Sequence, residues 1–239
     1  MTVEIETSTT TVNGLGAYLA RPVGGSERGM LLLPMITGIG ERVREFAQII
    51  AATGLTVLTW DPWHGPSSDD TERPQLQELM SALDDDVVLG ELDQLLDHLF
   101  GELGCTRAGV IGWCLGGRFA LILGGRDDRL ANVVAYHPTV PGTPAPNHTV
   151  DAVTLTGRIK APVMMLYPGA DALVPHESFQ RLQSALQSRE SGPSIVHIYP
   201  NAEHGFSTRP HEGNPENAEA WAISWPQVLE FIRVSMGER

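Results

Sequence analysis

Short runs of apolar residues alternate along the chain with longer stretches of mixed polarity. Runs that are apolar along their whole length are typical of strands buried on both faces of a parallel sheet. Six runs fit this pattern, at residues 30–35, 56–60, 108–112, 133–136, 163–167 and 195–199. We expect each of them to form a central strand.

The intervening stretches have helical periodicity: Val43, Phe46, Ala47 and Ile50, for example, fall on one face of a helix. Helices are expected at residues 42–52, 74–100, 115–124, 176–188 and 215–236. The second should break near the acidic run 84–86, which we interpret as a solvated helix boundary or as acidic charge at a helix N-terminus. Residues 139–157 show no clear pattern and form either a rim loop over the site or a solvated surface loop.

The N-terminal segment differs from the rest. Residues 3–7 and 17–21 alternate loosely between polar and apolar, and Asn13-Gly14 between them is a strong signal for a tight hairpin turn. Together with the strand–helix alternation that follows, this predicts an α/β fold. We expect a mostly parallel, doubly wound sheet with an N-terminal antiparallel hairpin.

Composition narrows the function classes. A length of 239 residues predicts one domain spanning residues 1–239. The formal net charge of −13 argues against nucleic-acid partners and anionic membrane surfaces. No apolar run approaches the ~20 residues of a membrane span, and the polar, Thr-rich start does not read as a secretion signal, so we expect a cytoplasmic protein.

Two cysteines, Cys105 and Cys114, are too few for a disulfide framework or a four-thiolate metal site. The histidines other than His204 show no paired ligand spacing, so no metal is expected.

The strongest chemical signal is Gly112-Trp113-Cys114-Leu115-Gly116-Gly117, between a predicted strand and a predicted helix. This G-x-C-x-G-G pattern is typical of a nucleophile elbow, where side chains at the flanking positions would collide with the neighbouring strand and helix. The N-terminus of the following helix favours a thiolate and an oxyanion. The alternative, a small buried hydrophobe, is weakened by these glycines and flanking elements. Cys105 lacks this context and is expected to be structural.

A cysteine nucleophile needs a base, and the base needs an orienting group. In chain order the candidates are Asp171, which follows the strand at 163–167, and His204, which follows the strand at 195–199. In a doubly wound sheet, ligands bind at the carboxyl ends of the strands, so these loops should meet Cys114. Alone, Asp171 is equally compatible with a turn residue.

The elbow, the G-A-D-A-L-V-P segment at 169–175 and the E-H-G-F segment at 203–206 together resemble the dienelactone hydrolase family of α/β-hydrolases. The resemblance covers residues from about 29 to 236. It implies an α/β-hydrolase fold without a large cap domain and no cofactor. It also implies that Cys114 is the nucleophile, His204 the base and Asp171 its orienter, with the backbone N–H groups of Ile36 and Leu115 forming the oxyanion hole.

The resemblance also implies a glutamate that takes part in switching on the thiol, and two arginines that hold a substrate carboxylate. Met35 stands at the glutamate position and cannot accept a proton, so either His204 activates Cys114 directly or the activity is altered. Arg73 falls at the first arginine position. Thr208 matches the second, with Arg209 one step on. Solvated surface arginines are the alternative for both.

Trp63 and Trp113 lie near strand ends and either line an apolar substrate pocket or pack in the core. The resulting hypothesis is a cysteine-dependent, carboxymethylenebutenolidase-like hydrolase of small-molecule lactones or esters, acting through an acyl-thioester, as a monomer or small homo-oligomer. The alternatives are a general esterase, thioesterase or acyl transferase, a cysteine peptidase-like enzyme, and a non-catalytic ligand-binding relative. The intact order of Cys, Asp and His argues against the last.

Overall fold

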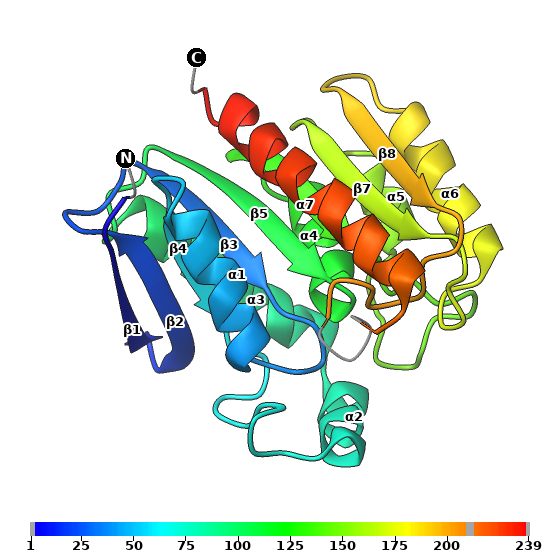
Figure 1. Cartoon of the computed structure of the whole chain (residues 1–239), viewed down its shortest axis with the longest axis horizontal. Helices are drawn as coiled ribbons and strands as arrows, with labels where there is room; N and C mark the ends of the chain where they lie inside the picture. The colour runs from blue at the N-terminus through cyan, green and yellow to red at the C-terminus, as the bar shows by residue number, and fades with distance from the viewer. Residues whose placement is uncertain (1–2, 209–212, 238–239) are drawn as a thin grey trace.

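A single mixed sheet organises the chain in the computed structural model, which describes residues 3–208 and 213–237. Among these residues the sheet has eight strands in the order β1-β2-β4-β3-β5-β6-β7-β8 (Figure 1). Their bounds are β1 Ile5–Val12, β2 Leu15–Pro22, β3 Arg28–Leu33, β4 Thr56–Trp60, β5 Arg107–Trp113, β6 Leu130–Tyr136, β7 Val163–Pro168 and β8 Ser194–Tyr199. Strand β2 is antiparallel to β1 and β4, and all pairs from β4 to β8 are parallel.

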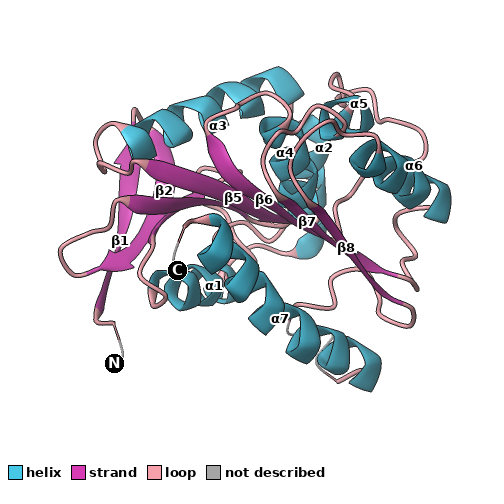
Figure 2. Ribbon diagram, turned by 90° about the horizontal axis from the view of Figure 1, so that it is seen from above, coloured by secondary structure: helices cyan, strands magenta, loops and turns pink. Residues whose placement is uncertain are grey.

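Helices cover both faces of this sheet. Their bounds are α1 Glu41–Ala51, α2 Arg73–Ala82, α3 Asp85–Phe100, α4 Leu115–Gly124, α5 Ala152–Thr156, α6 His176–Gln187 and α7 Pro215–Ser235. Figure 2 shows α1 and α7 on one face and α3, α4, α5 and α6 on the other. The predicted α/β-hydrolase fold with a doubly wound, mostly parallel sheet is confirmed.

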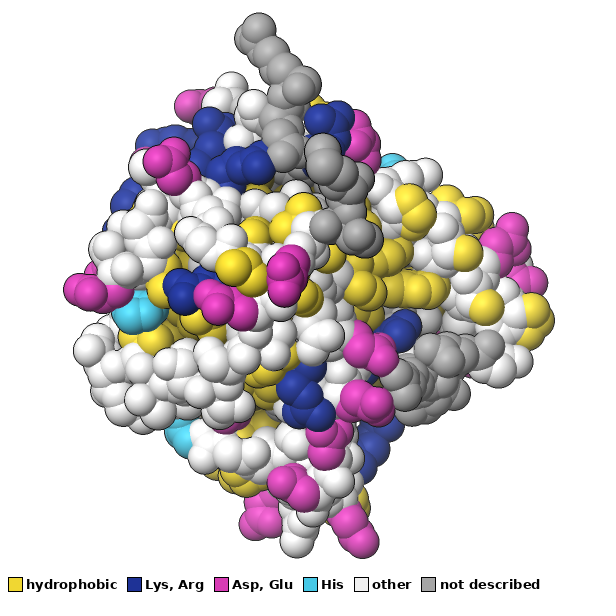
Figure 3. All heavy atoms as spheres, turned by 60° about the vertical axis from the view of Figure 1, so that its left-hand side comes forward, with side chains coloured by type: hydrophobic (Ala, Val, Ile, Leu, Met, Phe, Trp, Pro, Cys, Tyr) yellow, Lys and Arg dark blue, Asp and Glu magenta, His cyan; other side chains and the backbone are white. Residues whose placement is uncertain are grey.

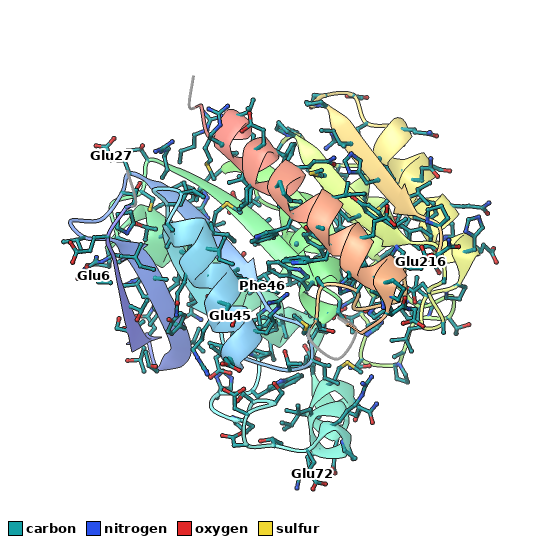
Figure 4. The ribbon with its side chains drawn as sticks, in the orientation of Figure 1. Glu6, Glu27, Glu45, Phe46, Glu72 and Glu216 are labelled. Atoms are coloured by element: carbon teal, nitrogen blue, oxygen red, sulfur yellow. The ribbon has the colours of Figure 1, made fainter. Side chains whose placement is uncertain are left out.

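Each face of the sheet carries its own apolar core, which explains why the central strands are apolar throughout. Adjacent strand residues point to opposite faces: Val110 packs with the α3 and α4 side, and Ile111 with the α1 and α7 side. On the second side, Phe46 reaches from α1 toward the sheet (Figure 4). Its ring stacks on Trp113 with 4.7 Å between centroids, and Trp113 stacks on Tyr136 at 5.4 Å.

The N-terminal hairpin is longer than predicted but turns where predicted. Its register runs from the Ile5–Pro22 pair to the Val12–Leu15 pair, leaving Asn13 and Gly14 as the turn. Both turn residues have positive φ, 53° and 89°, as a two-residue hairpin of the favoured type requires.

The helical stretch at residues 74–100 breaks where the acidic run predicts. Asp84 caps α3 by accepting hydrogen bonds from the N–H groups of Asp86 and Val87. The interpretation of the whole run as solvated is wrong for Asp85, however, which is 2% exposed. Its carboxylate forms a two-pronged ion pair with Arg118 of α4, with both N–O distances at 2.7 Å.

The same ion pair fixes part of the connection at residues 139–157. Arg118 donates to the carbonyl of Val150 at 3.1 Å, and the Val150 N–H donates to Asp85 at 3.0 Å. The connection then forms α5, whose N-terminus is capped by the Asp151 side chain. This stretch is therefore anchored to the helical layer at residue 150.

The surface on the side of β1 and β2 carries charges of both signs, as Figure 3 shows. Arg21 and Glu6, for example, pair across this hairpin at 2.7 Å. Within residues 3–208 and 213–237, no helix combines the length and apolar character needed to cross a membrane.

Three glycines let the start of α4 lie backbone to backbone against the ends of β5, β3 and β6. A Cβ on Gly112 would overlap the carbonyl of Gly116, and one on Gly116 would overlap the carbonyl of Leu33. A Cβ on Gly117 would lie 2.8 Å from the carbonyl oxygen of Tyr136. The glycines of the elbow are thus required by close packing between the start of α4 and the ends of β3 and β6.

Gly116→Ala should lower the free energy of unfolding by about 3 kcal/mol, because the new methyl group meets rigid backbone rather than a movable side chain. Urea denaturation measures the change. Gly90→Ala is the matched control: Gly90 lies inside α3, and a Cβ there would meet no atom within 4 Å. That control should stabilise by about 0.5–1 kcal/mol. Equal stability of Gly116→Ala and wild type would contradict the packing argument.

Candidate active site

Cys114 occupies the turn between β5 and α4 with a backbone conformation that side chains rarely adopt. Its φ and ψ are 53° and −112°. Such strain persists only where the surroundings enforce it. Here the Cys114 N–H donates to the carbonyl of Tyr136 at 3.0 Å, and the Gly116 N–H donates to that of Pro34 at 3.1 Å. The turn is thus bonded to the ends of β6 and β3 on either side.

Three predicted residues from separate loops meet at this turn, beyond the carboxyl ends of the parallel strands (Figure 1). His204, after β8, lies with Nε2 3.1 Å from the sulfur of Cys114. Its Nδ1 lies 2.8 Å from Oδ2 of Asp171, which follows β7. The side chains of His204 and Asp171 are 9% and 1% exposed. The imidazole can therefore exchange a proton with the sulfur while the carboxylate fixes its tautomer.

The Asp171 loop is held by its own side chain. Oδ1 of Asp171 accepts hydrogen bonds from the N–H groups of Leu173 and Val174 at 2.8 and 2.9 Å. Oδ2 is left for His204. The Asp171 carboxylate thus stabilises its own turn and orients His204 at the same time.

The His204 loop is fixed to the neighbouring loop and to α7. The Ala170 N–H donates to the carbonyl of Ala202 at 2.9 Å, which joins the Asp171 and His204 loops. On the other side, the Glu203 N–H donates to the side-chain oxygen of Asn217 at 2.8 Å, and the Asn217 amide donates back to Glu203 at 3.0 Å. Asn217 is fully buried.

The electrostatic interaction between Cys114 and His204 favours an ionised Cys114 thiol. Burial raises the pKa of Cys114, but the hydrogen bond and positive charge of His204, the Thr139 hydroxyl and the Leu115 N–H outweigh it, and the pKa falls below the usual value of a thiol. Burial alone would lower the pKa of His204, yet its bonds to Asp171 and Cys114 raise it to about 10. Both shifts favour a thiolate facing an imidazolium in the resting site.

Cys105 provides the contrast. It is buried two residues before the start of β5, and burial raises its pKa to about 11. The predicted structural character of this cysteine agrees with a thiol that stays protonated at neutral pH.

The loop after β3 presents the N–H of Ile36, the second predicted oxyanion donor. The Gly38 N–H donates to the carbonyl of Met35 at 3.1 Å and closes a turn. Because a trans peptide points its C=O and N–H in opposite directions, this bond directs the Ile36 N–H out of the turn. No hydrogen-bond acceptor is recorded for that N–H among the described residues.

Trp63 holds this loop from outside. Its indole N–H donates to the carbonyl of Ile36 at 2.9 Å, and the residue is 6% exposed. A Cβ on Gly38 would lie 2.7 Å from the indole ring, so the glycine is needed for the contact. The Ser68 N–H adds a bond to the carbonyl of Thr37 at 2.9 Å.

The other residues predicted to contact substrate lie in different surroundings. Trp113 is fully buried between Phe46 and Tyr136, so we assign it to the core and not to a pocket. Met35 is 4% exposed and packs in the same apolar cluster. Arg73 is exposed at the start of α2, just after Glu72, which Figure 4 places at the outer end of that helix. Arg209 lies outside the described residues.

Thr139 was missed by sequence reasoning as a residue of the site. It follows β6, and its Oγ1 lies 3.0 Å from the sulfur of Cys114 and 3.4 Å from Nε2 of His204. The available signals were its place just beyond the carboxyl end of a strand and at the start of residues 139–157, for which a rim loop over the site was one interpretation. Among the described residues, no group of three or more His, Cys, Asp or Glu side chains is arranged to hold a metal ion.

Comparison with known proteins places this geometry in context. A model of the dienelactone hydrolase family matches residues 15–235. A Salmonella typhi protein named "Putative carboxymethylenebutenolidase" is 28% identical over 236 residues, covering 93% of this chain and 84% of that protein. A Rhodococcus opacus "Carboxymethylenebutenolidase" is also 28% identical, over 211 residues, 87% of this chain and 81% of its own.

Among solved structures, a Klebsiella pneumoniae protein described as "Putative Dienelactone Hydrolase" superposes with a TM-score of 0.84. The match covers 96% of this chain and 98% of that one, at 23% sequence identity. The mixed sheet, its two helical layers and the loops that meet at the elbow define an α/β-hydrolase. Within that class, the chain belongs to the dienelactone hydrolase family.

The raised pKa of His204 gives a test of the ion pair. In the wild type the ring should stay protonated through neutral pH and lose its proton near pH 10. In Cys114→Ala the thiolate is gone, so the pKa of His204 should fall, while Asp171 still holds it above the usual value of histidine. NMR titration of the ring carbons measures both.

Cys105→Ala is the control for this titration, because it removes a thiol remote from His204 and should leave the pKa of His204 unchanged. A wild-type His204 that titrates near pH 6.5, as an unperturbed histidine does, would show that no ion pair exists.

Proposed function

We propose that this protein is a cysteine-dependent hydrolase of lactones or esters in which Cys114, His204 and Asp171 form the catalytic triad. The observation that carries the proposal is the position of His204 between the other two, 3.1 Å from the sulfur and 2.8 Å from the carboxylate. A nucleophile bonded to a base, and a base bonded to an orienting group, is the arrangement that acyl transfer requires.

In the first half-reaction the Cys114 thiolate attacks the carbonyl carbon. The oxyanion that forms is held by the N–H groups of Ile36 and Leu115, which are rigid backbone donors. As the tetrahedral intermediate collapses, the C–O bond breaks and the His204 imidazolium gives its Nε2 proton to the leaving alkoxide. The products are an acyl-thioester on Cys114 and either a free alcohol or, from a lactone, a hydroxyl still tethered to the acyl group.

In the second half-reaction His204, now neutral, takes a proton from water as the water attacks the thioester. The second tetrahedral intermediate collapses, expels the Cys114 thiolate and leaves His204 protonated. The resting ion pair is thereby restored. Asp171 keeps Nδ1 protonated throughout, so that Nε2 alone exchanges protons. The reaction needs no cofactor.

A general esterase acting on neutral esters is the second candidate, and the surroundings of Met35 favour it. Met35 is buried in an apolar cluster and brings no charge to the site, and Arg73 is exposed at the start of α2. Met35 supplies no charged contact of the kind that a substrate carboxylate would favour. The ratio of rates on p-nitrophenyl acetate and on a dienelactone separates this candidate from lactone preference.

Cys114→Ala should lower the hydrolysis of p-nitrophenyl acetate, or of a dienelactone, to the background rate, because the covalent step is lost. Product absorbance gives the rate, and mass spectrometry of the quenched wild type should show an acyl group on Cys114. Cys105→Ala is the matched control and should keep wild-type activity. Full activity in a folded Cys114→Ala variant would refute the proposed nucleophile.

Trp63→Phe tests the proposed oxyanion loop. It keeps an aromatic ring but removes the N–H that fixes the Ile36 carbonyl. We expect kcat to fall about tenfold with little change in KM, because a donor that acts mainly in the transition state is displaced. The alkylation rate of Cys114 by iodoacetamide should be unchanged.

Trp60→Phe is the control for that variant. It removes another buried indole N–H, bonded to Glu91 at 2.8 Å, and should cost stability without lowering kcat. If Trp63→Phe retains wild-type kcat, the indole bond does not position an oxyanion donor.

A further inference from the structure

Thr139 is tied to the nucleophile by its backbone as well as its side chain. Its N–H donates to the carbonyl of Cys114 at 3.0 Å, while the Cys114 N–H donates to Tyr136 at 3.0 Å. Residues 136 and 139 thus bond to the same residue from either side. The short distance between the Thr139 hydroxyl and the sulfur is therefore built into the loop.

The conformation of the intervening residues fixes this position further. His137 has a φ of 35°, and its N–H donates to the carbonyl of Leu166 at 2.8 Å. The ring of His137 is buried and packs edge-on against His204, with 4.8 Å between centroids. A residue held at positive φ turns the chain sharply, and this turn brings Thr139 back over the elbow.

The neighbours of the Thr139 hydroxyl determine whether it donates or accepts a hydrogen bond. A thiolate accepts hydrogen bonds and cannot donate one, so the 3.0 Å contact with the sulfur makes the Thr139 hydroxyl the donor. The 3.4 Å contact with Nε2 of His204 is longer, and a protonated ring nitrogen there can only donate. With Cys114 as the thiolate and His204 protonated, the hydroxyl proton therefore points toward the sulfur.

We propose that Thr139 is a further catalytic residue, whose hydroxyl donates a hydrogen bond to the sulfur of Cys114 and holds it as the thiolate in the resting enzyme. The inference rests on the proposed role of Cys114 as nucleophile. With Met35 apolar, the stabilising groups that face the sulfur are the His204 imidazolium, the Leu115 N–H and this hydroxyl. The other titratable groups of this cluster, Asp171 and His137, contact His204.

Thr139→Val tests the role, because valine keeps the branched shape and removes only the donor. The readout is the pH dependence of Cys114 alkylation by iodoacetamide, which reports the thiolate without any enzyme substrate. Loss of a hydrogen bond to a charged group should raise the apparent pKa of Cys114 by about one and slow alkylation about tenfold at pH values below that pKa. The rate constant for acylation by p-nitrophenyl acetate should fall in parallel in that pH range.

Thr139→Ser keeps the hydroxyl and should restore an alkylation profile near that of the wild type. Thr139→Ala serves if the valine variant does not fold, as judged by thermal unfolding. An unchanged alkylation profile in the valine or alanine variant, or an equal change in the serine variant, would overturn the proposal. Because alkylation is measured without substrate, failure of the proposed hydrolase activity would appear separately, as a missing acyl-enzyme with an intact alkylation profile.

Discussion

The site depends on one steric constraint, the direct contact of backbone with backbone where α4 begins. Side chains at Gly112, Gly116 or Gly117 would overlap the carbonyls of α4, β3 or β6. With those side chains absent, the chain turns sharply enough to give Cys114 its strained φ of 53°. The strain is sustained because hydrogen bonds to Tyr136 and Pro34 hold the turn from both neighbouring strands. The position of the sulfur and the strain at Cys114 thus follow from packing at glycines two and three residues away.

The second constraint is electrostatic: the Cys114 thiolate must be stabilised against a desolvation penalty that the packing itself creates. Packing that holds the turn also removes water from the sulfur, and this desolvation disfavours the thiolate. The imidazolium of His204 outweighs the penalty, and its own pKa is raised to about 10 by Asp171 and by the thiolate. The two charges therefore support one another, and Asp171 stabilises the thiolate indirectly by keeping His204 protonated. Removing Asp171 alters the titration of His204 and Cys114, and removing either of these two alters the titration of the other.

Local chemistry explains what the sequence predicted well. The Asn13-Gly14 turn, the break before α3 at Asp84 and the bounds of β4 at Thr56–Trp60 depend on residues that are neighbours in the chain. The convergence of Cys114, Asp171 and His204 could also be predicted, because the ends of parallel strands share one edge of the sheet. These predictions needed strand positions and chain order, and no side-chain packing.

What the sequence could not give depended on partners far along the chain or on the face of a strand. Asp85 looked solvated within its acidic run, and its partner Arg118 lies 33 residues away. Trp113 adjoins Cys114 in sequence, but it is the last residue of β5, and a strand apolar on both faces does not reveal which side its ring takes. Thr139 has no motif at all, since a hydroxyl gains its role only from the sulfur and imidazole that the fold brings beside it.

Charged groups and neutral hydrogen-bond donors have different roles in this site. His204 and Asp171 supply the charges. The Ile36 loop is held by the Trp63 indole and by the Ser68 N–H, which carry no net charge. Neutral donors fix a loop without perturbing the titration of the thiol, so the loop and the ion pair depend on different contacts. A change in the segment from Trp63 to Ser68 can therefore move the Ile36 N–H while the Cys114–His204 pair stays intact, so the proposed oxyanion donor and the proposed nucleophile depend on separate contacts.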